Sequence, residues 1–153
     1  MNSIEIQVIS NSDVIPAEEK LQLWVDAALA EWTSETELVI RIVDEQEISL
    51  LNEQFRHKKG PTNILSFPFE VPEAVPVNLL GDLVVCAPVL EEEAKVQHKS
   101  LEHHWAHIIV HGVLHLLGYD HIDEADAEEM ESKEIAILAR LHINNPYNEV
   151  YDI

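Results

Sequence analysis

Several short stretches of the chain alternate between hydrophobic and polar residues or are rich in β-branched residues, and both patterns predict strands. We expect strands over 3–9 (SIEIQVI), 38–43 (LVIRIV), 63–70 (NILSFPFE) and 79–86 (LLGDLVVC). Pro68 has no N–H to donate, so it favours an edge or a bulge in the third strand. Gly81 is a candidate for a bulge in the fourth.

Apolar residues spaced three and four apart predict helices over most of the remaining chain. We expect helices over 16–32, 88–97, 101–117 and 124–141, and one that begins after Asp44 and carries Arg56 near its end. Asp44 and Glu47 have the spacing of a capping box. The helix that follows them would bury three apolar residues, Ile48, Leu51 and Phe55.

Strands come early in this pattern and helices cluster late, which predicts an α+β fold with a single small mixed sheet covered by helices. Residues 71–78 contain prolines and are expected to form a loop. With no internal repeat and no linker rich in proline and glycine, we expect 1–153 to form one domain. The pattern does not predict the order of the strands.

Composition indicates a soluble protein of the cytoplasm. The N-terminus lacks the basic start and apolar run of a signal peptide. The longest apolar stretches fall far short of the roughly 20 residues that a membrane span needs, so no membrane partner is expected. The one cysteine, Cys86, fits a reducing compartment, and its place at the end of an apolar strand predicts a buried thiol.

The charge balance is strongly acidic. Twenty-nine Asp and Glu residues stand against nine Lys and Arg, for a formal net charge of −20. This balance argues against extensive contact with phosphates, which draw on lysine and arginine. Three of the nine basic residues nevertheless lie within four positions, 56–59 (RHKK). This run is either a solvated loop or a local positive patch that guides an anion into a cleft.

Three histidines lie within the eleven residues 111–121 (HGVLHLLGYDH). His111 and His115 are four apart, which places them on one face of a helix with Cβ atoms about 5–6 Å apart. Gly118 is suited to end the helix and turn the chain, so that His121 approaches from a third side. Three imidazoles with a fourth position open are typical of a catalytic zinc site, although nickel and copper suit the same ligands.

His107 is a further candidate, because it lies one turn before His111 on the same face and could replace His121. His107, His111 and His115 would span roughly 12 Å along the helix axis, which is too far for one ion. We therefore assign His107 to the cleft wall or to the surroundings of the ligands. Asp120, beside His121, could orient a ligand histidine through a hydrogen bond.

The spacing His-x3-His-x2-Gly-x2-His is that of the metzincin metalloproteases, in which a glutamate general base follows the first histidine. Here that residue is Gly112. A metal ion would still lower the pKa of its bound water to about 7 and polarise a substrate oxygen. If the substrate is a phosphodiester, the most useful further group is a fixed cation, for which Arg56 is the best candidate.

Three blocks, 111–121 (HGVLHLLGYDH), 55–70 (FRHKKGPTNILSFPFE) and 81–85 (GDLVV), make the chain resemble the YbeY family of bacterial rRNA-maturation endoribonucleases. The resemblance runs from about residue 35 to Tyr147. It implies an α+β fold related to zinc metalloproteinases, with the metal on a helix. It further implies a zinc-dependent, single-strand-specific endoribonuclease that matures the 3′ end of 16S rRNA in the small subunit and acts in ribosome quality control.

The resemblance places the metal ligands at His111, His115 and His121, with His111 and Arg56 as the catalytic residues. Metal-bound water would attack the phosphodiester while Arg56 stabilises the developing charge. Ser66 and Lys59 would line the substrate cleft. Single-stranded rRNA, the small ribosomal subunit and assembly factors are the implied partners. Two alternatives stay open: a metal-dependent peptidase, and a non-catalytic ribosome-assembly factor with structural zinc.

Two other features are expected to serve packing and solubility. Trp24, Trp32 and Trp105 each lie in a predicted amphipathic helix, so we interpret them as packing residues and not as platforms for RNA bases. The run 123–134 (DEADAEEMESKE) is interpreted as a solvated helix face.

Overall fold

The fold is described from a computed structural model that covers residues 2–32, 36–69, 79–120 and 123–147. Four strands are present: β1 (Ser3–Val8), β2 (Glu37–Val43), β3 (Ile64–Pro68) and β4 (Leu79–Cys86). Five helices accompany them: α1 (Glu18–Ala28), α2 (Glu45–Arg56), α3 (Ala87–Val96), α4 (Leu101–Leu116) and α5 (Glu124–Arg140). The predicted α+β class is confirmed, and the loop expected over 71–78 lies outside the described residues.

The strands form one mixed sheet in the order β1-β2-β4-β3. The pairs β1–β2 and β2–β4 are parallel, whereas β3 runs antiparallel to β4 at the edge of the sheet. Pro68 therefore lies in an edge strand, as its missing N–H predicted. The register between β2 and β4 shifts beside Gly81, whose φ is +149°, and a Cβ there would come within 2.4 Å of the Phe67 carbonyl oxygen.

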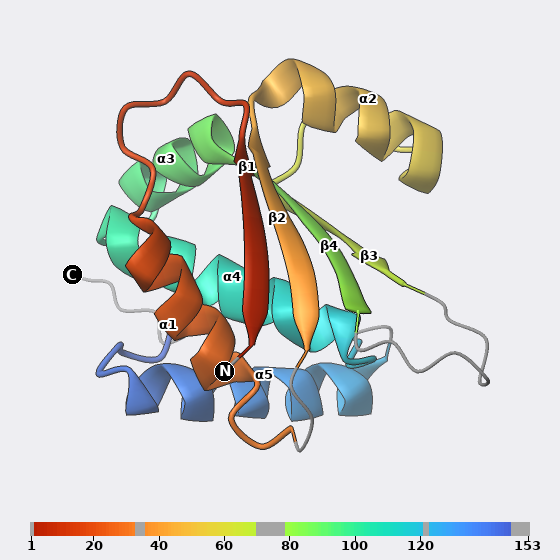
Figure 1. The fold of residues 1–153 in the computed structure, drawn as a ribbon. Coiled ribbons are helices and arrows are strands. Elements are labelled where there is room, and N and C mark those ends of the chain that lie inside the picture. Colours follow the sequence, from red (N-terminus) through yellow and green to blue (C-terminus); the bar gives the residue numbers. More distant parts are fainter. Residues whose placement is uncertain (1, 33–35, 70–78, 121–122, 148–153) are drawn as a thin grey trace.

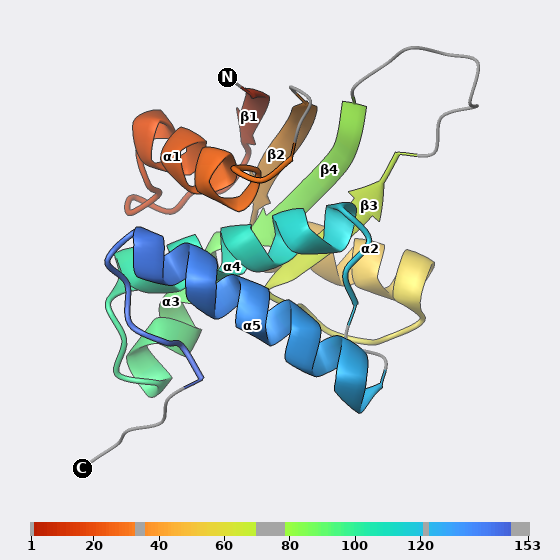
Figure 2. The same cartoon turned by 90° about the horizontal axis from the view of Figure 1, so that it is seen from below.

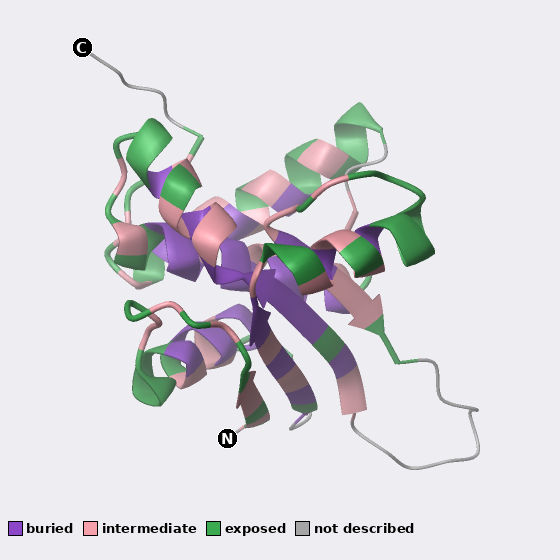
Figure 3. Cartoon of the chain, turned by 90° about the horizontal axis from the view of Figure 1, so that it is seen from above, coloured by how far each residue is buried: buried purple, intermediate pink, exposed green. Residues whose placement is uncertain are grey.

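Alternation along the strands sends side chains to two separate cores. Leu83 and Val85 of β4 face the larger core, which α1, α4 and α5 cover, while Val84 and Cys86 face a smaller one beneath Ile48 of α2. Figure 2 shows α4 lying between the sheet and α5. Figure 3 shows the buried residues concentrated in the sheet and in α4. Helix α4 is thus the central element of the fold (Figure 1).

Three local predictions were wrong. Helix α1 ends at Ala28, so Trp32 lies beyond the helix and is 48% exposed instead of packed. The capping box does not form, because Asp44 accepts hydrogen bonds from Ser10 and Asn11 and Glu47 pairs with Arg41. The bidentate ion pair between Arg41 and Glu47 is stronger than a helix cap, because donor and acceptor are both charged.

Phe55 is also placed differently, since it is 55% exposed and only meets Phe67 edge to face. The smaller core covers α2 mainly around Ile48 and Leu51, so the last turn of the helix extends past it. Within the described residues, no helix is both long and apolar enough to cross a membrane.

Candidate active site

Helix α4 begins and ends where its sequence favours it. The Ser100 side chain accepts a hydrogen bond from the His103 N–H, which satisfies one of the free donors of the first turn. At the other end Gly118 adopts a φ of +103°, and the Gly118 and Tyr119 N–H groups donate to the carbonyls of His115 and Leu114. The chain therefore turns back immediately after the turn that holds His115, as predicted from Gly118.

His111 and His115 lie side by side on α4. Their ring centroids are 4.6 Å apart and the rings are inclined at 80°. Both rings are partly exposed. A separation of this size allows one nitrogen of each ring to reach a single ion at about 2.0–2.1 Å. His121, the third predicted ligand, lies outside the described residues. Among those that are described, no group of three donor side chains could hold a metal ion.

The carboxylate of Glu134, whose charged neighbours predicted a solvated face, hydrogen-bonds to the His111 ring. Glu134 of α5 is fully buried, and its Oε2 accepts a hydrogen bond of 2.6 Å from Nδ1 of His111. In the ring tautomer that donates from Nδ1, the lone pair lies on Nε2, the atom that a metal would bind. Glu134 therefore orients His111 and fixes its tautomer.

The second oxygen of Glu134 is also satisfied. Oε1 accepts hydrogen bonds from His107 Nε2 at 2.9 Å and from the Tyr147 hydroxyl at 2.5 Å. The structure thus places His107 one turn behind His111, bound to the same carboxylate. Three protein donors replace the water that this carboxylate loses on burial.

The ionisation of these groups follows from burial and hydrogen bonding. Burial by itself raises the pKa of Glu134, but the hydrogen bonds from His107, His111 and Tyr147 bring it down to about 2. Burial lowers the pKa of His107, although its bond to Glu134 opposes this. Burial and the contact with Glu134 raise the pKa of Tyr147. Glu134 is therefore ionised and Tyr147 is a neutral donor near pH 7.

The sequence carries a signal for the burial of Glu134 in the spacing of its apolar neighbours. The buried residues of α5 are Met130, Glu134, Ile137 and Leu138. These positions follow the helical spacing of an apolar stripe, with the glutamate in the middle of it. A charged residue at a core position indicates a buried partner. The solvated-face interpretation of 123–134 was therefore wrong at Glu134, and Met130 of the same run is buried as well.

Gly112, where a metzincin carries its glutamate, faces the sheet. A Cβ at this position would come within 2.6 Å of Ile64 Cδ1 and 2.9 Å of Leu83 Cδ2. The Gly112 carbonyl lies 3.4 Å from the Ser66 hydroxyl of β3, which donates to it. A longer side chain would point into the core, so the helix has no place for the protease base at this position.

The residues predicted to line the substrate cleft differ in solvent exposure. Arg56 and Lys59 are exposed at and beyond the end of α2, and Asp120 is half-buried after Gly118. Buried Asn52 fixes the loop between Arg56 and Gly60, because its amide donates to the Gly60 carbonyl at 2.9 Å. Within the described residues, no hydrogen bond joins Arg56 to His111 or His115.

A family model and two similar proteins all point to the same family. The model of the family described as Endoribonuclease YbeY matches residues 5–142. A protein named Endoribonuclease YbeY from Colwellia psychrerythraea is 52% identical over 150 residues, which covers 95% of this chain and 97% of that protein. One of the same name from Methylococcus capsulatus is 56% identical over 141 residues, covering 92% and 93%.

A solved structure shares the fold. The solution structure of TM1509 from Thermotoga maritima superposes with a TM-score of 0.57 at 24% identity, covering 94% of this chain and 99% of that one. At this identity the likeness concerns the fold alone. The family match and the relatives together show that the chain belongs to the YbeY family of endoribonucleases.

Proposed function

We propose that this chain is a zinc-dependent hydrolase that cuts single-stranded RNA within the strand. We further propose that it acts in the cytoplasm on rRNA of the small ribosomal subunit together with assembly factors, in maturing the 3′ end of 16S rRNA and in ribosome quality control. Family membership supports the endoribonuclease activity. The observation that carries the metal site is the pair His111–His115 with Glu134 hydrogen-bonded to His111.

In this proposal His111, His115 and His121 hold the ion. An all-imidazole donor set suits zinc, and a carboxylate behind a ligand histidine is a recurrent feature of such sites. When bound, zinc supplies an acidified water as nucleophile and a positive charge for a substrate oxygen. Glu134 keeps His111 oriented, and His107 completes the support behind it.

The remaining predicted residues would act on the RNA. Arg56 would face the negative charge that develops on the phosphate, and Lys59 would attract the strand to the same side. Ser66 would line the cleft beside α4, since its hydroxyl contacts the carbonyl of Gly112. Asp120 would orient a ligand histidine near the turn after α4.

Metal content tests the ligand assignment. We expect about one equivalent of zinc by plasma emission in untagged wild type, and a loss of at least about tenfold in His115→Ala. His103→Ala is the matched control, because His103 is an exposed histidine of the same helix, and it should retain the metal. Zinc retained in His115→Ala, or absent from wild type, would contradict the site.

RNA cleavage tests the role of Arg56. Arg56→Ala should lower the cleavage of single-stranded RNA about 100-fold, because it removes a charge that acts mainly in the transition state. Its zinc content should not change. Lys58→Ala, an exposed neighbour in the same basic run, should stay within about threefold of wild type. If metal removal unfolded the protein and no preparation cut RNA, the assembly-factor alternative would replace this proposal.

A further inference from the structure

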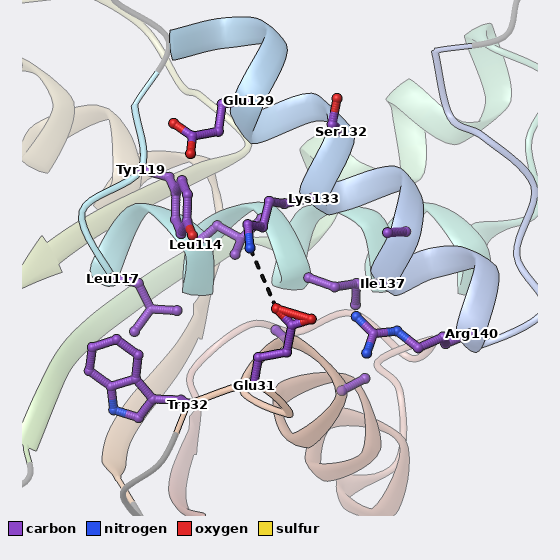
Figure 4. Close-up of a pocket in the computed structure, with 13 residues that line it drawn as sticks. Glu31, Trp32, Leu114, Leu117, Tyr119, Glu129, Ser132, Lys133, Ile137 and Arg140 are labelled. Carbon is purple, nitrogen blue, oxygen red and sulfur yellow. Dashed lines mark hydrogen bonds and ion pairs between the residues drawn. The ribbon is translucent and has the colours of Figure 1, made fainter.

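A cavity of about 440 Å³ opens between α1 and α5, and Glu134 is not among the described residues that line it (Figure 4). Small side chains from both helices line it, namely Ala27 and Ala28 of α1 and Ala136 of α5. Leu114 and Ile137 add an apolar floor. A volume of this size accommodates a side chain or a short peptide segment.

An exposed indole stands at one end of the cavity. Trp32 is 48% exposed and lines both this cavity and a smaller adjoining one of about 290 Å³. Leu117 and Tyr119 line both as well. Half-exposed tryptophan and tyrosine beside an apolar floor are the residues that dominate the energetics of protein–protein contacts.

The charges around the smaller cavity are all of one sign. Asp120, Asp126 and Glu129 line it, and no Lys or Arg of the described residues does. In the larger cavity, Lys133 is matched by Glu31 at 3.5 Å and lies over the Tyr119 ring, while Arg140 marks the far end. Figure 4 shows this Lys133–Glu31 pair spanning the cavity between Trp32 and Arg140.

We propose that these two cavities dock a positively charged segment of a protein partner. An apolar side chain of the segment lies on the alanine-rich floor, and an arginine or lysine side chain stacks on Trp32 and pairs with Asp126 and Glu129. An arginine over an indole gains from both stacking and cation–π attraction. The net charge of −20 steers a cationic partner toward the chain, and the carboxylates that line the smaller cavity disfavour a polyanion at this site.

Fluorescence of Trp32 provides the test, because Trp24 and Trp105 are 3% and 0% exposed. The probe is the blocked peptide acetyl-Gly-Arg-Leu-Gly-Arg-Leu-Gly-amide, and its counterpart carries glutamate in place of arginine. We expect the arginine peptide to shift the emission of the full chain and the glutamate peptide to leave it unchanged. Trp32→Phe should remove the shift, while NMR shifts of α5 amides still report binding.

Charge variants distinguish a protein segment from RNA. Asp126→Asn and Glu129→Gln should each weaken the arginine peptide about threefold, and Arg140→Gln should not. Their zinc content should match wild type, which separates this proposal from the histidine site. Equal responses to both peptides, or no response at millimolar concentration, would overturn it. A response to oligouridylate that Arg140→Gln abolishes would assign the cavities to RNA instead.

Discussion

Glu93 and Glu134 both contact histidines of α4, and they do so in different surroundings. Glu93 of α3 lies 2.8 Å from Nε2 of His104, near the start of the helix, and its side chain is 30% exposed. Glu134 lies between His107 and His111 and is fully buried. Glu93 remains open to solvent, whereas the enclosed Glu134 accepts hydrogen bonds from His107, His111 and Tyr147.

This difference in burial predicts that the stability of the fold depends more on Glu134 than on Glu93. A carboxylate that is 30% exposed keeps part of its hydration, so its loss costs less even though His104 itself is buried. An enclosed carboxylate leaves its donors unsatisfied when it is removed, and each such loss is large. Glu134 also holds a histidine that we assign to the metal, so its removal should affect binding as well as stability.

The largest expected effect comes from placing a carboxylate on the wrong face of α4. Gly112→Glu would send a charge toward Ile64 and Leu83, where the structure offers no space for it. We expect a loss of about 4 kcal/mol or more in the free energy of unfolding, or no soluble protein.

Gly60→Glu is the control for Gly112→Glu, since nothing lies within 4 Å of a Cβ there. Because its φ of +89° strains any residue that has a side chain, we expect Gly60→Glu to lower the free energy of unfolding by about 1–2 kcal/mol. Urea denaturation measures both. A soluble Gly112→Glu of wild-type stability would show that α4 does not pack as described.

Neutralising each carboxylate separately tests whether Glu134 contributes more to stability than Glu93. Glu134→Gln should lower the free energy of unfolding by about 3 kcal/mol, because an amide group is a poor acceptor for three donors at once. Glu93→Gln should lower it by less than about 1 kcal/mol. Zinc affinity should fall at least about tenfold in Glu134→Gln and should stay unchanged in Glu93→Gln. Equal effects of the two variants on stability would remove the distinction between the pairs.

Low pH should weaken the hydrogen bonds that Glu134 accepts, measured in protein without metal. The pKa of Glu134 is lowered from 4.5 to about 2, so the folded state binds its proton less readily than the unfolded state. Its stabilising contribution is complete above pH 4.5 and is lost as the pH falls toward 2. The stability gap between wild type and Glu134→Gln should therefore narrow over this range in chemical denaturation. A constant gap would contradict the lowered pKa.

The smallest effect concerns the third donor. Tyr147→Phe removes the hydroxyl that donates to Glu134 but keeps the ring, which packs against His107 at 5.3 Å between centroids. We expect a loss of about 1.5 kcal/mol, typical of one hydrogen bond to a charged group. Thermal and urea unfolding measure it. A loss as large as that of Glu134→Gln would mean that Tyr147 alone secures the carboxylate.

Sequence reasoning succeeded for most local signals, although the capping box of Asp44 and Glu47 does not form. The strands, the helices and the turn at Gly118 follow from periodicity and from residues with special backbone preferences. It failed for Glu134 because the run 123–134 was interpreted by its charge and not by its position in the stripe of Met130 and Ile137. It failed for Trp32 because helix α1 ends four residues earlier, which apolar spacing alone does not indicate.

The spacing of His111 and His115 is enough to place them on one face of a helix, since helical spacing is set by local backbone hydrogen bonds. Three blocks of residues in order also indicate the family. The strand order, the direction of Gly112 into the core and the pairing of Glu134 with His111 become visible in the folded molecule alone. Those depend on which surfaces, far apart in the chain, bury one another, and a local pattern does not specify its distant partner.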